Sequence, residues 1–224
     1  MNGIDIYYFS GTGNSLAVGR KLAGRLDAEL IQIVSADASA AAETVGLVFP
    51  LYDFKPPEPV RAFIKILEGL EHRYIFAVCT YGIAAHHALT NLNEELKTRG
   101  GRLSGGFAVP MPFNAIGSEA VTDRERARLL SGWKERLGEI VSYVERRESG
   151  TIESGGLFGG LFRMQTVRML PTLIAFFGRL LVKGPDSFAF TAKEGCDGCG
   201  VCACLCTVAY IEITDGLLVW HDLC

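Results

Sequence analysis

The stretch YYFSGTGNSLAVGRKL, residues 7–22, decides the expected fold of this chain. An apolar run that begins at Ile4 predicts a short buried strand, and Val18 and Leu22 then recur at helical spacing. A turn rich in glycine and hydroxyl groups lies between them. The first turn of a helix leaves backbone N–H groups without intrahelical partners, and the helix dipole favours an anion there. The sequence therefore predicts a phosphate turn, residues 10–15, made of Ser10, Gly11, Thr12, Gly13, Asn14 and Ser15.

The residues of the phosphate turn argue against two common nucleotide sites. A P-loop needs a lysine followed by Ser or Thr after its last glycine, whereas this turn continues with Asn14 and Ser15. A dinucleotide site needs a third glycine, where this chain has Leu16, and an acidic residue after the second strand, which ends without one. Hydroxyl and N–H groups without a cation suit a phosphate monoester. The alternative is an ordinary glycine-rich turn that binds no ligand.

Length and composition limit the possible classes of protein. The 224 residues accommodate one α/β domain with a small appendage, and a hydrophobic content of 49% is ample for a core. A net charge of −3 makes nucleic acid an unexpected partner. The N-terminus runs almost directly into a strand rather than a signal peptide, so we expect a cytoplasmic protein. Six of the seven cysteines fall between Cys196 and Cys224, which favours metal binding over a disulfide framework.

Strand and helix patterns alternate along the first two thirds of the chain. After the first strand, apolar runs predict strands at residues 29–34, 44–49 and 74–79 and a fifth that ends at 107–109. Five strands alternating with helices predict a doubly wound parallel sheet of the α/β class. The apolar stripes of the expected helices are Val60, Phe63, Ile64 and Leu67; Ala85, Ala88, Leu89, Leu92 and Leu96; and Leu130, Trp133, Leu137, Ile140, Val141 and Val144.

The SGTGNS turn closely resembles the phosphate loop of flavodoxins, which hold FMN. The resemblance implies a flavodoxin-like sheet of order 2-1-3-4-5, with FMN at the switch point between strands 1 and 3. The segments after strands 3 and 4 resemble the two flavin-ring loops of that family, and each offers a tyrosine face that suits a flat ring. Ordinary surface tyrosines are the alternative. The implied ring-loop residues are Pro50, Leu51, Tyr52 and Asp53 in the first loop and Thr80, Tyr81 and Gly82 in the second.

The first ring loop departs from the family pattern in one respect. Flavodoxins commonly have a small residue there that tolerates a positive φ, so that a backbone group can reorient toward the reduced ring. This chain has no glycine at that point, and Asp53 is the best candidate for the positive φ.

Residues 150–185 are basic and apolar. Their longest uncharged run, residues 169–178, is too short to span a bilayer. One interpretation is a weak contact of residues 157–183 with a membrane surface or a partner. We favour a helical connector whose apolar side packs on neighbouring domains.

Cys196, Cys199, Cys202 and Cys206 have C-x2-C-x2-C-x3-C spacing. Thiolates select iron–sulfur clusters or zinc. A zinc ribbon would normally separate two C-x2-C pairs by a longer loop, so iron–sulfur is favoured. The motif resembles that of bacterial ferredoxins, although Thr207 replaces the usual proline. Residues 188–190 before the motif, and 211–213 and 217–220 after it, resemble the small strands that frame two-cluster ferredoxins. Cys204 falls between the ligand positions and is expected to be a spectator thiol.

The order of the two motifs resembles a group of prokaryotic flavodoxin–ferredoxin fusion proteins. The resemblance implies a flavodoxin-like domain at residues 1–149, a connector at 150–185 and a small ferredoxin-like α+β module at 186–224. It also implies FMN and 4Fe–4S clusters as cofactors. A second cysteine motif would begin at about Cys224, where this sequence ends, so we expect these 224 residues not to assemble the usual cluster pair.

The expected function is electron transfer between FMN, the iron–sulfur module and an unidentified redox partner. The main alternative is a flavin-dependent oxidoreductase linked to NAD(P)H or quinone, with the clusters as accessory input. A third possibility is a phosphate-binding interaction module. No Ser-His-Asp or Cys-His arrangement stands out, which agrees with a carrier whose chemistry belongs to its cofactors.

Overall fold

The computed structural model describes residues 3–37, 42–82, 84–112, 122–154, 196–207 and 210–220. It divides into two compact units, Met1–Met169 and Leu170–Cys224. The first unit holds the expected phosphate turn, and the second holds the cysteine motif (residues 196–206). The expected connector lies almost wholly outside the described residues. No helix among the described residues is long and apolar enough to cross a membrane.

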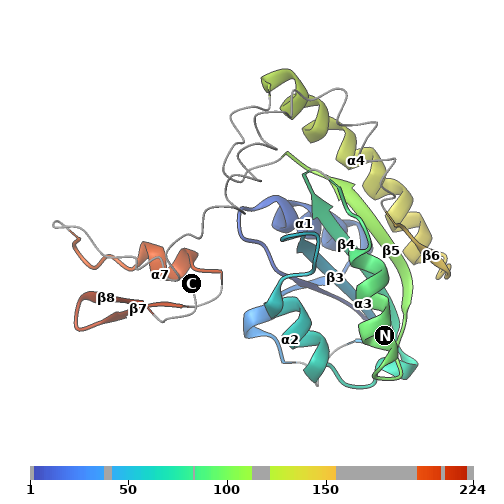
Figure 1. The fold of residues 1–224 in the computed structure, drawn as a ribbon, viewed down its shortest axis with the longest axis horizontal. Coiled ribbons are helices and arrows are strands. Elements are labelled where there is room, and N and C mark those ends of the chain that lie inside the picture. The colour runs from blue at the N-terminus through green and yellow to red at the C-terminus, as the bar shows by residue number, and fades with distance from the viewer. Residues whose placement is uncertain are drawn as a thin grey trace, which may run out of the picture. The chain divides into compact units, whose positions relative to one another are not determined.

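A parallel sheet of six strands forms the first unit, in the order β2-β1-β3-β4-β5-β6 (Figure 1). The predicted order 2-1-3-4-5 is confirmed, and the fold is flavodoxin-like. The sixth strand was not predicted; it adds two residues of the expected connector beside β5. The strands are β1 Ile4–Tyr8, β2 Glu29–Gln32, β3 Thr44–Pro50, β4 Tyr74–Tyr81, β5 Leu103–Pro110 and β6 Thr151–Ile152.

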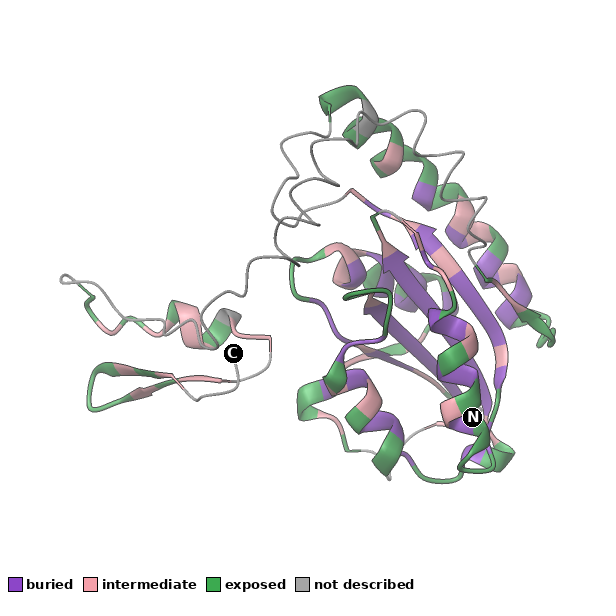
Figure 2. Ribbon diagram, in the orientation of Figure 1, coloured by how far each residue is buried: buried purple, intermediate pink, exposed green. Residues whose placement is uncertain are grey.

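Helices cover both faces of the sheet, α1 and α4 on one face and α2 and α3 on the other (Figure 1). This coverage explains why β3 and β4 are buried along almost their whole length, shown purple in Figure 2. The helices of this unit are α1 Asn14–Leu26, α2 Glu58–Ile66, α3 Ala88–Lys97 and α4 Asp123–Glu145, with short 3-10 turns at Ile33–Ser35 and Leu70–His72.

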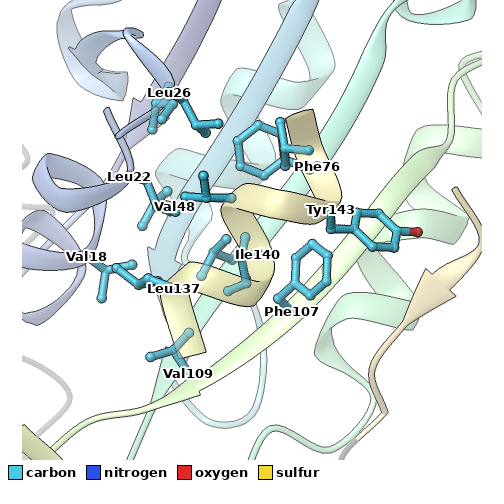
Figure 3. Close-up of a cluster of buried hydrophobic side chains, with 14 of the residues drawn as sticks. Val18, Leu22, Leu26, Val48, Phe76, Phe107, Val109, Leu137, Ile140 and Tyr143 are labelled. Atoms are coloured by element: carbon cyan, nitrogen blue, oxygen red, sulfur yellow. The ribbon is translucent and has the colours of Figure 1, made fainter. Parts of the chain in front are cut away.

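The core between α1, α4 and the sheet follows the predicted helical stripes (Figure 3). Val18 and Leu22 of α1 meet Leu137 and Ile140 of α4 in one apolar cluster. The prediction of a buried Leu130 is wrong, because that residue is 45% exposed. Trp133 is the first buried residue described along α4. The apolar stripe of this helix therefore begins before the helix reaches the core.

Gly46 of β3 leaves room on this face of the sheet for side chains of its two neighbouring strands. A Cβ at Gly46 would lie 2.5 Å from Phe76 Cζ and 3.1 Å from Ile6 Cγ1. Both neighbours are fully buried, so neither side chain has room to move aside. The absence of a side chain at this position is therefore a packing requirement.

The second unit contains a short helix, α7 Val201–Leu205, and an antiparallel hairpin of β7 Ile211–Thr214 and β8 Leu217–Trp220. Both predicted strands after the cysteine motif are confirmed. Asp215 and Gly216 form the hairpin turn with φ of 52° and 74°, as a two-residue turn of the primed type requires. The expected strand at residues 188–190 lies outside the described residues.

Candidate functional site

The carboxyl ends of β1, β3, β4 and β5 lie side by side, because the four strands are parallel neighbours in the sheet. Ligands of open α/β sheets bind at this edge, where the chain order reverses on either side of β1. Backbone hydrogen bonds join each strand end to the next: Phe9 N–H to Val48 O at 2.9 Å, Leu51 N–H to Thr80 O at 3.0 Å and Met111 N–H to Tyr81 O at 2.9 Å.

The phosphate turn connects β1 to the first turn of α1. Gly13 lies at the N-cap with φ of 92°, and no side chain caps the helix. Ser10 Oγ accepts a hydrogen bond from Gly13 N–H at 3.1 Å, which fixes the curl of the turn. Gly11, Thr12 and Gly13 are exposed. An uncapped helix N-terminus beneath an exposed turn of this kind is suited to an anion.

Two side chains of the turn hold it against the end of β4 and the segment after β5. Ser15 Oγ and Thr80 Oγ1 are 2.8 Å apart, and both residues are buried. Asn14 Nδ2 donates to the Pro112 carbonyl at 3.0 Å. The structure thus brings together Ser15 and Thr80, which the sequence assigned to separate loops, and it adds Pro112. The position of these hydroxyl and amide groups favours a supporting role for both residues of the turn.

The first ring loop forms a tight turn after β3. Tyr52 N–H donates to Lys55 O at 3.0 Å, and Lys55 N–H donates to Tyr52 O at 2.9 Å. Asp53 and Phe54 between them have φ of 48° and 62°. The positive φ expected at Asp53 is confirmed. Phe54 adopts one as well, which no sequence signal announces because bulky residues rarely do so.

The Tyr52 side chain reaches from this loop to the phosphate turn. A Cβ at Gly11 would lie 2.2 Å from Tyr52 Oη, so the hydroxyl lies directly against the Gly11 backbone. The ring packs edge-on against Phe9, with 6.3 Å between ring centroids. Burial raises the pKa of Tyr52, and the neighbouring Gly11 backbone partly opposes that rise. Two predicted site residues, Gly11 and Tyr52, are therefore in direct contact.

The second ring loop follows β4. Tyr81 is half-buried at the strand end, and Gly82 is exposed. The two ring loops meet where the ring of Phe54 packs against that of His86, with 4.5 Å between centroids and an interplanar angle of 80°. Sequence reasoning did not find this contact, because neither residue belongs to a periodic pattern. Pro50 and Leu51 lead from β3 into the first loop.

The cysteine motif is described from Cys196 to Cys206. Cys196 and Cys199 are exposed, whereas Cys202 and Cys206 are half-buried. Among the described residues, no three His, Cys, Asp or Glu side chains lie where they could hold one metal ion. The expected fifth ligand, Cys224, lies outside the described residues. The cysteines as placed do not fit an iron–sulfur cluster, and the metal-ligand assignment stays a prediction.

Backbone contacts nevertheless organise the cysteine motif. Tyr210 N–H donates to Cys206 Sγ at 3.2 Å, and Cys199 N–H donates to Asp197 Oδ1 at 3.1 Å. A Cβ at Gly198 would lie 2.4 Å from the Gly216 carbonyl oxygen, so the motif packs closely on the hairpin turn. Cys79 is separate from the motif: it is buried in β4, and burial raises the pKa of its thiol.

No protein-family model and no curated protein matches the chain. Similar solved structures include a rubredoxin oxygen:oxidoreductase from the anaerobe Desulfovibrio gigas, with 17% identity over 66% of this chain and 37% of that chain, at a TM-score of 0.44. A flavodoxin from the domain Archaea is 15% identical over 64% of this chain and 99% of that one, at a TM-score of 0.45. An FMN-dependent NADH-azoreductase from Bacillus anthracis is 12% identical over 64% and 99%, at a TM-score of 0.47. These similarities are too weak to carry a function, and the strand order itself defines the fold.

Proposed function

We propose that this chain is an FMN-binding electron-transfer protein. The observation that carries this function is the uncapped, hydroxyl-lined phosphate turn at the first βα junction, held by hydrogen bonds to Thr80 of β4 and to Pro112 after β5. No charged side chain belongs to the turn. A single phosphate monoester therefore suits it better than a polyphosphate, which proteins usually bind with a lysine or a metal ion.

The residues of the site fit FMN in two groups. The N–H groups of the phosphate turn and the Thr12 hydroxyl would hold the phosphate, while Ser10, Asn14 and Ser15 keep the turn in shape. The flavin ring would lie against the loops after β3 and β4. When bound, the flavin supplies electron transfer in single steps or in pairs. The ring-contact residues in this proposal are Pro50, Leu51, Tyr52, Asp53, Thr80, Tyr81 and Gly82.

The iron–sulfur relay is the second part of the proposal, and it rests on sequence spacing. The ligands would be Cys196, Cys199, Cys202 and Cys206 together with Cys224, and a bound cluster would supply one-electron transfer. Tyr210 N–H donates a hydrogen bond to Cys206 Sγ, and sulfur ligands of iron–sulfur clusters receive hydrogen bonds of this kind. Because the described cysteines do not converge, we assign no electron path through them.

Flavin titration of the purified protein tests this function. We expect anaerobically purified protein to show flavin absorbance and the apoprotein to bind FMN more tightly than riboflavin or FAD. FMN should bind most tightly, because riboflavin has no phosphate and FAD carries a second one. A protein that binds none of the three flavins would contradict the proposal and favour a phosphate-binding interaction module. A carrier should also show no turnover with NAD(P)H unless a reductase is added, whereas a flavin-dependent oxidoreductase would turn over alone.

A further inference from the structure

Given the proposed FMN site, we propose that the Tyr52 hydroxyl closes the phosphate turn and must swing away before a phosphate binds. Tyr52 would thus control how fast the site takes up phosphorylated ligands. This role is distinct from contact between the tyrosine ring and the flavin.

The position of the hydroxyl is the first observation. Tyr52 Oη lies 2.2 Å from the point where a Cβ of Gly11 would stand, and Tyr52 Cζ lies 3.5 Å from it. Only glycine leaves room for this approach. The tip of the side chain therefore occupies space directly against the backbone of the exposed phosphate turn.

The chemistry of the contact is the second observation. The Tyr52 hydroxyl lies against the Gly11 backbone, and this backbone partly opposes the rise in the pKa of Tyr52 that burial causes. A phosphate bound to the turn would approach the same backbone to reach its N–H groups. A phosphate oxygen and the Tyr52 hydroxyl cannot occupy the same space, so the hydroxyl and the phosphate compete.

The freedom of the side chain is the third observation. Tyr52 is 47% exposed, and its described ring contact is a single edge-on packing against Phe9. The backbone below it is held by the paired hydrogen bonds between Tyr52 and Lys55. Opening therefore needs rotation of the side chain and no rearrangement of the loop. Side-chain rotation of this kind is fast and inexpensive.

Stopped-flow binding of FMN to apoprotein and to the Tyr52→Phe variant tests the inference. Phenylalanine keeps the ring and removes the competing oxygen. We expect FMN to associate about two- to tenfold faster, and inorganic phosphate to bind tighter by a similar factor, as the removal of one competing polar contact implies. Riboflavin, which has no phosphate, should bind both proteins at the same rate. Circular dichroism would verify that the half-exposed substitution leaves the fold intact.

The possible failures are distinguishable. Equal association rates of FMN with both proteins would overturn the role of Tyr52 and leave the FMN site standing. A selective loss of FMN affinity in Tyr52→Phe would also overturn it, because the hydroxyl would then be a phosphate ligand. If neither protein binds FMN or inorganic phosphate, the proposed function itself fails, and the closing role fails with it.

Discussion

The two units differ in how they gather the residues of their candidate sites. In the first unit, Ser15 and Thr80 are 65 positions apart in sequence, yet their hydroxyls are 2.8 Å apart. They meet because β1, which leads into α1, and β4 end at the same edge of the sheet, with β3 between them. In the second unit, Cys196 and Cys206 belong to one short motif, yet the described cysteines do not converge on a metal position. Hydrogen-bonded sheets fix a site without its ligand, whereas metal sites are rarely preformed without the metal. Two residues whose strands end at the same sheet edge are therefore more reliably brought together than two residues that are close in sequence.

Cofactor content should separate the two units most strongly. After anaerobic reconstitution, we expect the 224-residue protein to hold FMN fully but to contain far less than the about eight iron atoms that two 4Fe–4S clusters require. The physical reason is that two such clusters take eight cysteine ligands, whereas these 224 residues contain seven cysteines and Cys79 is buried in β4. Iron and labile sulfide assays measure the cluster content, and flavin absorbance measures the FMN content. About eight iron atoms and eight sulfides per chain would contradict the expected difference between the units.

A serine scan of the motif supplies the control for this measurement. Any iron that does bind should be lost in Cys199→Ser and retained in Cys204→Ser, because only Cys199 occupies a ligand position of the ferredoxin spacing. Equal losses in both variants would show that the spacing does not select the ligands.

Close packing of the sheet gives the largest expected stability effect. Gly46→Ala places a methyl group against buried Phe76 and Ile6, and we expect it to lower the free energy of unfolding by roughly 1–3 kcal/mol. Chemical denaturation measures the change. Gly24→Ala is the matched control, since Gly24 lies exposed in α1 with no neighbour within 4 Å. That substitution should stabilise the protein by about 0.5–1 kcal/mol. Similar losses in both variants would contradict the packing role of Gly46.

The cysteine unit offers a parallel test with a smaller effect. Gly198 has φ of 67°, and a Cβ there would meet the Gly216 carbonyl, a backbone atom that cannot rotate away. We expect Gly198→Ala to weaken the hairpin contact by roughly 1–2 kcal/mol, seen as faster amide exchange at residues 211–220. Gly216→Ala tests the conformational part alone, because Gly216 has φ of 74° and no neighbour within 4 Å. Equal exchange in the two variants would mean that the contact adds nothing.

The hydrogen bond between Ser15 and Thr80 should give the smallest effect. A double-mutant cycle with Ser15→Ala and Thr80→Val is expected to show a coupling of about 0.5–1.5 kcal/mol in unfolding free energy. Valine keeps the shape of threonine and removes its hydroxyl. Strictly additive losses would mean that the two hydroxyls do not stabilise each other, and the site would lose its bond between α1 and β4.

The sheet and most of its core could be predicted from the sequence, because burial on a helix face or inside a parallel sheet imposes a period on apolar residues. The stripe through Val18 and Leu22 and the apolar run of β4 show this directly. Strand β6 was not predicted, because a strand of two residues is too short to show an alternation of apolar and polar residues. Leu130 was assigned wrongly because a pattern does not reveal where a helix leaves its core.

The sequence named residues for the candidate site, but it did not reveal their hydrogen-bond partners. The sequence indicated that Ser15 carries a useful hydroxyl, but only the fold shows that this hydroxyl meets Thr80. It indicated a positive φ at Asp53, but that at Phe54 depends on the paired bonds between Tyr52 and Lys55. Contacts of this kind arise from tertiary geometry, which local sequence does not encode.

The most direct test of the central claim compares FMN and riboflavin binding to the wild-type apoprotein and to Thr12→Ala. If the phosphate turn holds a phosphate, losing the Thr12 hydroxyl should weaken FMN binding by roughly 1.5–3 kcal/mol, the contribution of a hydrogen bond to a charged group. Riboflavin affinity should hardly change. Fluorescence titration measures both constants on the same protein. An equal loss for the two ligands, or no loss for FMN, would contradict the assignment of residues 10–15 as a phosphate site.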